Sequence, residues 1–286
     1  MLRLSELRLP LDHGPDDLEQ AVLRCLKIPP ARLLRCQLVK RSVDARRRDR
    51  IQLIYSVDVA LDGEAALLRR RHGDRRIRPT PDTHYKYVAQ APEGSVWDSE
   101  QRPVVVGAGP CGYFAALLLA QMGFRPLLLE RGQPVKQRTA DTFGFWRRTA
   151  EFNPESNAQF GEGGAGTFSD GKLYTRSMKR GKIQEILELL VLHGADENIL
   201  YEAHPHIGTN KLPEIIENLR ETIRDNGGEV RFGAKLTDLN IIGQQVKEIA
   251  INGQWESCQN VVLATGHSAR DIYYLLHQNQ IALEAK

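Results

Sequence analysis

The pattern of apolar and polar positions divides the chain into two regions. Over the first 71 residues, alternating apolar positions predict strands, and apolar positions three and four residues apart predict helices. The expected elements are a strand at 2–11, a helix at 15–26, a hairpin formed by 34–39 and 51–61, and a helix at 64–71. Residues 72–100 are rich in Pro, Gly and Asp, which favours a linker. We therefore expect a small α+β domain over residues 1–95.

The second region, residues 96–286, combines short continuous apolar runs with amphipathic helices. The runs are typical of parallel strands covered on both faces, and the apolar residues at helical spacing predict core helices. The expected strands are 104–106, 127–129, 229–232 and 261–263, the expected helices are 135–150, 183–191 and 212–225, and three short strands joined by tight turns are expected at 235–241, 246–251 and 254–257. We treat residues 135–211 as an insertion that holds a glycine-rich loop and helices.

The sequence GAGPCG at residues 107–112 follows the first apolar run and begins a helix that is apolar almost all round. Gly107 permits a tight turn, Gly109 lets a diphosphate approach the main chain, and Gly112 lets the helix pack closely on the strand. Pro110 fits the first helical turn, because an N–H group there has no partner within the helix. The free amides and the dipole at this end of the helix favour an anion. This spacing predicts a dinucleotide-binding turn.

Glu130 ends the second apolar run, where its carboxylate can accept hydrogen bonds from the hydroxyls of an adenosine ribose. A GxGxxG pattern alone is a weak signal, but the strand before it, the helix after it and this acid all agree. The fold class that we expect is therefore α/β: a Rossmann-like FAD/NAD(P)-binding parallel sheet with a three-stranded meander over residues 96–286. The small basic α+β domain over residues 1–95 precedes it.

A second glycine loop follows at residues 161–166, with the sequence GEGGAG. No apolar strand precedes this loop, so it does not predict a second dinucleotide fold. Residues 166–172 match GxxxxGK, but Leu173 stands where a P-loop needs Ser or Thr to hold magnesium. Consecutive backbone N–H groups in such a loop can form an anion-binding nest. We therefore favour a loop that faces a ligand over a mobile surface loop.

Three segments together resemble a known family: the glycine turn with Glu130-Arg131-Gly132, the loop GEGGAGTFSDGKL at 161–173, and the strand end ATGHSARD at 264–271. The chain resembles the flavin-dependent dehydrogenases of the glutathione-reductase-like superfamily, and more narrowly the bacterial group of FAD-dependent dehydrogenases. The resemblance implies bound FAD, with NAD or NADP as a possible electron donor. The residues that it assigns to the cofactor are Gly107, Gly109, Pro110, Cys111, Gly112, Glu130, Arg131, Gly163, Gly164, Ala165, Gly166, Thr265 and Gly266.

The resemblance also implies that members of this family are longer than this chain, and that the C-terminal part of the flavin pocket lies in the missing half. The function that we expect is an FAD-dependent oxidoreductase acting on an unidentified small-molecule substrate. One alternative is a catalytically incomplete FAD-binding fragment or scaffold. Another is a dehydrogenase that uses NAD alone, because Glu130 would serve its ribose equally well.

Catalytic residues are not fixed by the sequence, because a flavin carries the electron transfer itself. His267 is the first candidate for a proton donor, since it follows a strand end where α/β ligands collect. Lys172 and Arg270 are candidates for contact with an anion. His204 and His206 are weaker candidates than His267 for a proton donor. The four cysteines are widely spaced and form no CxxC pair, so we expect neither a disulfide framework nor a metal site.

Charge separates the two regions. Of the 39 Lys and Arg residues, 19 lie in residues 1–90, against 12 of the 36 Asp and Glu residues. Arginine runs at 41–50 and 69–78 could attract RNA, which makes a flavoprotein acting on RNA a further alternative. A solvated hairpin loop is the interpretation that we favour. No signal peptide and no membrane span is predicted, so we expect a cytoplasmic protein without a membrane partner.

Overall fold

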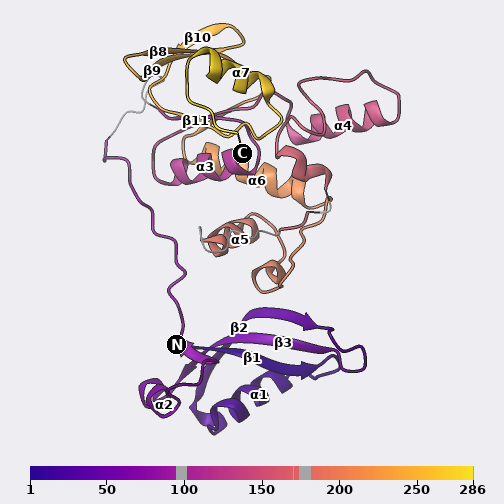
Figure 1. Cartoon of the computed structure of the whole chain (residues 1–286), viewed down its shortest axis with the longest axis vertical. Helices are drawn as coiled ribbons and strands as arrows, with labels where there is room; N and C mark the ends of the chain where they lie inside the picture. Colours follow the sequence, from indigo (N-terminus) through magenta and orange to yellow (C-terminus); the bar gives the residue numbers. More distant parts are fainter. Residues whose placement is uncertain (95–101, 170, 174–181, 286) are drawn as a thin grey trace. The chain divides into compact units, whose positions relative to one another are not determined.

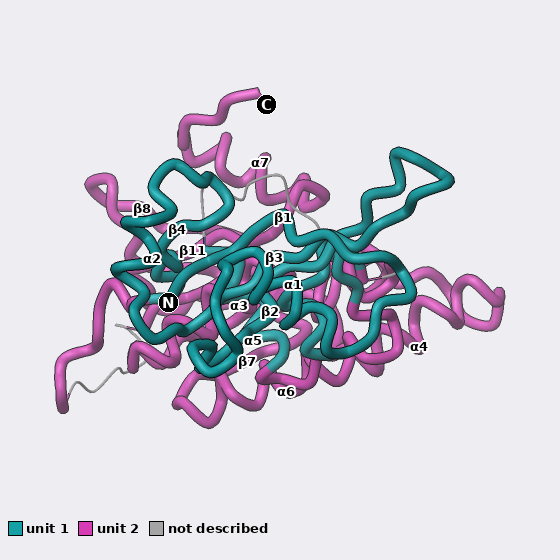
Figure 2. The backbone as a smooth tube through the Cα atoms, turned by 90° about the horizontal axis from the view of Figure 1, so that it is seen from below, with its two compact units in different colours: residues 1–85, 172–191, 196–206 teal, residues 86–171, 192–195, 207–286 magenta. Residues whose placement is uncertain are grey.

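The computed structural model describes residues 1–94, 102–169, 171–173 and 182–285, and it divides into two compact units (Figures 1 and 2). Unit 1 comprises residues 1–85, 172–191 and 196–206, and unit 2 comprises residues 86–171, 192–195 and 207–286. The domain boundary expected at residues 95–96 lies outside the described residues. Unit 1 holds one β-sheet, and unit 2 holds two.

Unit 1 is built on a four-stranded antiparallel sheet with the strand order β2-β3-β1-β4. Helix α1 covers one face of this sheet (Figure 1). Its residues Val22, Leu23 and Leu26 share a buried core with Leu2 and Leu4 of β1. The strands are β1 (Leu2–Pro10), β2 (Leu33–Asp44), β3 (Gln52–Leu61) and β4 (Ile77–Pro79), and the helices are α1 (Asp17–Leu26), the 3₁₀ turn η1 (Pro30–Arg32) and α2 (Glu64–Arg70).

A later segment of the chain joins this sheet. The Arg41 N–H on β2 donates to the carbonyl of Tyr201 at 2.7 Å, and the Ala203 N–H donates to the carbonyl of Arg41 at 2.9 Å. The segment includes α5 (Ile183–Leu192) and the 3₁₀ turn η3 (Glu197–Leu200). The hydrophobic pattern did not predict this pairing. The bridge joins only Arg41 and Glu202, and a bridge between single residues leaves no periodic pattern in the sequence.

Unit 2 holds a parallel sheet with the strand order β11-β5-β6-β7, and an antiparallel meander with the order β10-β9-β8. The α/β class, the parallel sheet and the meander are those predicted from the sequence. The strands are β5 (Val104–Val106), β6 (Leu127–Leu129), β7 (Glu229–Arg231), β8 (Leu236–Ile242), β9 (Gln245–Ile251), β10 (Gln254–Ser257) and β11 (Val261–Leu263). The helices are α3 (Pro110–Gln121), α4 (Val135–Trp146), the 3₁₀ turn η2 (Gly164–Phe168), α6 (Leu212–Asp225) and α7 (Arg270–Gln278).

Several elements differ from the expectation. Strand β2, expected at 34–39, runs from Leu33 to Asp44, so the first residues of the arginine run 41–50 lie in a strand and not in the hairpin loop. Residues 77–79, assigned to a linker, form β4 and pair with β1 in the register Leu2 to Pro79. Helix α7 was not predicted; it buries only Ile272 and Leu275. Helix α4 ends at Trp146 instead of 150, because Arg148 takes a left-handed backbone conformation with φ of 60°.

Among the described helices, none has the length and apolarity that a bilayer crossing requires. Within the same residues, no group of three or more His, Cys, Asp or Glu side chains is arranged to hold a metal ion.

Candidate functional site

Two of the three glycines in the first turn are required by packing. Gly107 has a φ of +102°, which favours glycine, and a Cβ atom there would lie 2.7 Å from the carbonyl oxygen of Ala264. A Cβ atom at Gly112 would lie 1.8 Å from the carbonyl oxygen of Gly107. Real Cβ atoms do not approach other atoms so closely. These two glycines therefore let β5, α3 and the chain after β11 meet.

Gly109 is different, because the fold does not require a glycine there. Its backbone is extended, with φ of −78° and ψ of −178°, so any residue could adopt it. A Cβ atom would meet only the Cα atom of Gly164, at 4.0 Å. Pro110 begins α3 immediately after it, and the N–H groups of the first helical turn have no acceptor within the helix. The turn therefore presents open space beside unpaired donors, which is what an anion needs.

Glu130 holds the turn against the end of β6. Its side chain is buried, with 5% of its surface exposed. Its Oε2 atom accepts a hydrogen bond from the Ala108 N–H at 2.8 Å, and its Oε1 atom accepts one from the Gly132 N–H at 2.8 Å. Each carboxylate oxygen keeps a further lone pair. The carboxylate thus fixes the main chain on both sides of the site.

The second glycine loop packs directly on the first turn. The Gly163 N–H donates to the carbonyl of Ala108 at 2.8 Å. A Cβ atom at Gly164 would lie 3.1 Å from Cδ of Pro110 and 3.2 Å from Cα of Gly109. The two glycine segments, far apart in sequence, therefore meet at a close main-chain contact.

Arg138 on α4 fixes the shape of this second loop. It is fully buried, and its guanidinium donates to the carbonyls of Asn157 at 2.8 Å, Glu162 at 2.7 Å and Gly164 at 2.7 Å. A further bond reaches Oγ1 of Thr167 at 2.9 Å. Burial lowers the pKa of this guanidinium to about 10. Neutral carbonyls satisfy its donors, so the loop is folded around a buried cation.

A buried carboxylate, Glu162, connects the same loop to three helices. It accepts hydrogen bonds from the hydroxyl of Tyr113 on α3, from the Val135 N–H at the start of α4 at 2.6 Å, and from Nη1 of Arg220 on α6 at 2.8 Å. A negative charge at the N-terminus of α4 is favourable. Burial, and then the charge of Glu162, raise the pKa of the Tyr113 phenol well above its ordinary value of 10.0.

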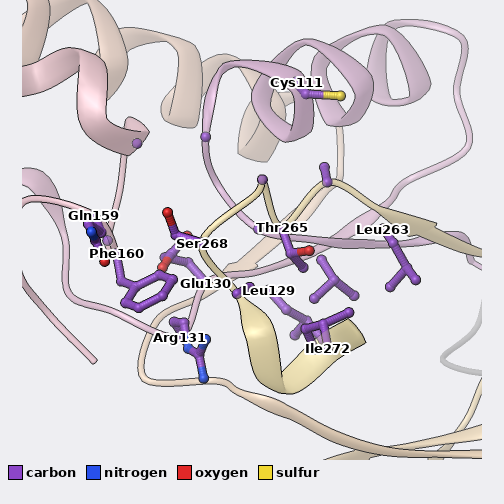
Figure 3. A pocket seen from close by; sticks show the side chains of 18 of the residues that line it. Cys111, Leu129, Glu130, Arg131, Gln159, Phe160, Leu263, Thr265, Ser268 and Ile272 are labelled. Atoms are coloured by element: carbon purple, nitrogen blue, oxygen red, sulfur yellow. The ribbon is translucent and has the colours of Figure 1, made fainter. Parts of the chain in front are cut away.

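A cavity of about 630 Å³ lies where these segments meet the carboxyl ends of β5, β6 and β11. Figure 3 shows its side chains, with Glu130 at the end of β6 and Thr265 and Ser268 on the chain that follows β11. This volume falls in the range of small-molecule and cofactor sites. The residues predicted from the sequence that line it are Gly107, Gly109, Pro110, Cys111, Glu130, Arg131, Gly164, Ala165, Thr265, Gly266 and His267.

Seven of the candidate residues do not line this cavity: Gly112, Gly163, Gly166, Lys172, His204, His206 and Arg270. Gly112 lies beneath the turn against Gly107, and a Cβ atom at Gly163 would lie 2.4 Å from the side chain of Ile216 on α6. Gly166 is also outside the lining residues. Lys172 belongs to unit 1, where it forms an isolated bridge with His206.

Sequence reasoning missed several residues of the cavity wall: Gln159, Phe160, Lys235, Ser268 and Ile272. The Arg131 guanidinium lies over the ring of Phe160 at 4.6 Å and pairs with Asp271 of α7. Burial opposes ionisation of Asp271, but the bond from Arg131 and the charges of Arg131 and Lys235 prevail and lower the pKa of Asp271. No local motif marks this ion cluster, because it joins residues from three separate segments.

Comparison with known proteins gives two sequence matches. Residues 1–60 match the family model described as a domain of unknown function, DUF8436. The whole chain is 39% identical over 285 residues to an uncharacterized protein of Clostridium beijerinckii (strain ATCC 51743 / NCIMB 8052). The chain spans 52% of the length of that relative.

Solved structures resemble the chain distantly. THI4 of Thermovibrio ammonificans has 20% identity and a TM-score of 0.43, with 64% of each chain covered. L-proline dehydrogenase from P. horikoshii has 13% identity and a TM-score of 0.37, covering 66% of this chain and 58% of its own. OTEMO in an FAD-bound form has 16% identity and a TM-score of 0.36, covering 58% of this chain and 25% of its own. At these TM-scores the likeness does not bear on function.

Proposed function

We propose that the chain binds FAD in the cavity beside the first glycine turn and acts as an FAD-dependent oxidoreductase. The observation that carries this proposal is the glycine at position 109. Among the described residues, a Cβ atom there would meet only Cα of Gly164 within 4 Å, and Gly109 directly precedes the first turn of α3, whose N–H groups have no acceptor within the helix. A ligand that brings anionic groups against the main chain accounts for the choice of residue.

The residues present fit a dinucleotide with a flavin at one end. Gly109 and the first turn of α3 would hold the diphosphate. The remaining lone pairs of Glu130 would accept the ribose hydroxyls, and Arg131 would border the adenosine. Gly164, Ala165, Thr265 and Gly266 would border the flavin, as the motif resemblance implies.

FAD, when bound, supplies the electron-transfer chemistry. The chain contributes binding, orientation and shielding from water, and no side-chain nucleophile is required. His267 is exposed at the cavity wall, with its Nδ1 atom 3.4 Å from Oγ of Ser268. It remains our candidate for moving a proton to or from an unidentified small-molecule substrate.

The glycine variant tests the binding site. We expect Gly109→Val to abolish FAD binding, because the two methyl groups would occupy the approach path of the diphosphate. Gly14→Val is the matched control: its backbone is not left-handed, and a Cβ atom there meets only Oδ2 of Asp17, at 3.7 Å. Flavin absorbance of the purified proteins after incubation with FAD measures the difference. Equal flavin in the Gly109 and Gly14 variants contradicts the proposal.

Cys111 offers a second readout that does not depend on turnover. Its side chain is exposed and lines the cavity, whereas Cys258 is buried and Cys25 and Cys36 are half-buried. We expect FAD to slow alkylation of Cys111, measured by mass spectrometry of the labelled peptides. Protection by NAD with none by FAD would replace this proposal with a dehydrogenase that uses NAD alone. Protection without turnover of reduced nicotinamide would favour an FAD-binding scaffold.

A further inference from the structure

An arginine-lined pocket lies at the tip of the β2–β3 hairpin in unit 1. Its lining residues are Arg8, Asp44, Arg46, Arg47, Arg50 and Gln52, and its volume is about 570 Å³. The register of the sheet explains the grouping: Gln52 of β3 pairs with Asp44 of β2 and with Pro10 of β1, so the hairpin turn lies beside the end of β1. The loop that joins β2 to β3 can be followed in Figure 1.

Asp44 fixes two of the guanidinium groups. Its Oδ1 atom accepts from Nε of Arg46 at 2.8 Å, its Oδ2 atom accepts from Nη2 of Arg46 at 2.5 Å, and Nη1 of Arg8 lies 3.4 Å from Oδ2. The bonds from Arg46 hold the pKa of Asp44 well below its ordinary range. The aspartate therefore stays ionised and keeps Arg8 and Arg46 on the same side of the pocket.

The other two arginines, Arg47 and Arg50, have no acidic partner within the described residues. Within the described ranges, no ion pair and no side-chain hydrogen bond joins the guanidinium of Arg47 or Arg50 to the protein, and both residues are exposed. Four arginines and one aspartate give the pocket wall a net charge of +3. Guanidinium groups bind phosphate oxygens through paired N–H donors, so this arrangement is complementary to phosphate.

The lack of aromatic side chains among the lining residues argues against a nucleic-acid ligand. None of the six lining residues is aromatic, whereas single-stranded nucleic acids are held largely by stacking of bases on aromatic side chains. A diphosphate presents two adjacent anionic groups to two pairs of guanidiniums, one pair fixed by Asp44 and one pair unmatched. We propose that this pocket binds the diphosphate group of a small molecule.

Titration calorimetry of the full chain with inorganic pyrophosphate tests this proposal. The test variant is Arg47→Ala/Arg50→Ala, which removes two exposed guanidiniums without breaking an ion pair. The matched control is Arg75→Ala/Arg78→Ala, which removes the same charge from exposed positions of the same unit outside the pocket. Both are measured in the Gly109→Val background, so that the pyrophosphate cannot occupy the turn proposed for the FAD diphosphate.

We expect saturable binding that the test variant weakens by about tenfold or more and that the control changes by less than about threefold. Equal weakening in both variants would show general attraction to a basic surface and overturn the proposal. Sulfate or inorganic phosphate binding as tightly as pyrophosphate would overturn the preference for two phosphates. An RNA oligonucleotide binding more tightly than pyrophosphate, with a steep salt dependence, would show a nucleic-acid interface instead.

Discussion

The three glycines in the first turn of unit 2 have different surroundings. Gly107 and Gly112 sit where another atom fills the place of a side chain, so they serve the fold. Gly109 sits where that place is empty, so packing does not require a glycine there. The motif predicted the packing roles of Gly107 and Gly112, because the spacing of the turn is local, and the assignment of Gly109 to a diphosphate stays a prediction. The geometry distinguishes the roles by the distance from each missing Cβ atom to its nearest neighbour.

This distinction predicts effects of different size for the same small substitution. We expect Gly109→Ala to change the free energy of unfolding by less than about 0.5 kcal/mol, because its Cβ atom has room. Gly112→Ala should lower it by about 2 kcal/mol, because overpacking forces the turn and helix apart. Urea denaturation followed by circular dichroism measures both. Equal losses in the two variants would mean that position 109 is packed like position 112.

Tyr113 predicts a dependence of stability on alkaline pH. Its pKa is raised in the folded protein, so the folded state holds the proton while the unfolded state loses it above pH 10.0. The contribution is complete below that pH and is lost as the pH rises further. Tyr113→Phe should therefore flatten the fall in stability above pH 10.0, and cost about 1 kcal/mol near neutral pH through the lost hydrogen bond. Identical pH profiles for both proteins would contradict this.

Other residues of the site could not be read from the sequence. Arginine is rarely fully buried, so nothing marked Arg138 as the centre of a loop. The bonds from Glu130 to Ala108 and Gly132 depend on the register of β5 and β6, which a local pattern does not specify. The sequence predicted a ribose ligand for Glu130, and that contact stays a prediction.

At the scale of elements, Glu162 connects α3, α4 and α6 to the second glycine loop. Strong apolar periodicity predicted α6 with its bounds unchanged, and the three-valine run predicted β5. Strand β4 and helix α7 escaped prediction: β4 depends on pairing with β1, and α7 buries only two of its residues. Contacts with other elements stabilise such segments, so their own sequence shows little periodic pattern.

The Glu162 junction should be far more sensitive than an ordinary surface ion pair. Glu162→Gln leaves Arg220, which is 13% exposed, without its buried partner, and we expect a loss of about 3 kcal/mol in unfolding free energy. Glu221→Gln removes another partner of the same arginine, but Glu221 is 53% exposed, so the loss should be below about 1 kcal/mol. Chemical denaturation compares them. An equal loss of unfolding free energy in Glu221→Gln and Glu162→Gln would show that burial of the carboxylate does not determine the strength of its ion pair.

At the scale of the whole molecule, the chain holds separate apolar cores in its two units. The hydrophobic pattern predicted both sets of strands. It did not predict that residues 172–191 and 196–206 would join the first unit, because contacts between distant segments leave no local pattern. Two cores imply two units whose stability can change independently.

Calorimetry can test this independence. Leu4→Ala in unit 1 and Ile249→Ala in unit 2 each truncate a fully buried side chain and should each cost about 2–5 kcal/mol. We expect each to lower one thermal transition and leave the other in place, and we expect FAD to raise only the transition lowered by Ile249→Ala. A single transition shifted by both substitutions would show that the units unfold together.

The cavity wall draws on residues from Val106 to Ile272, nearly the full span of unit 2. The wall is complete only when the segment around Val106 and the segment that ends at Ile272 are folded against each other. The FAD binding that we propose would therefore need β5, β6 and β11 folded together, and a chain truncated before Val261 should not retain flavin.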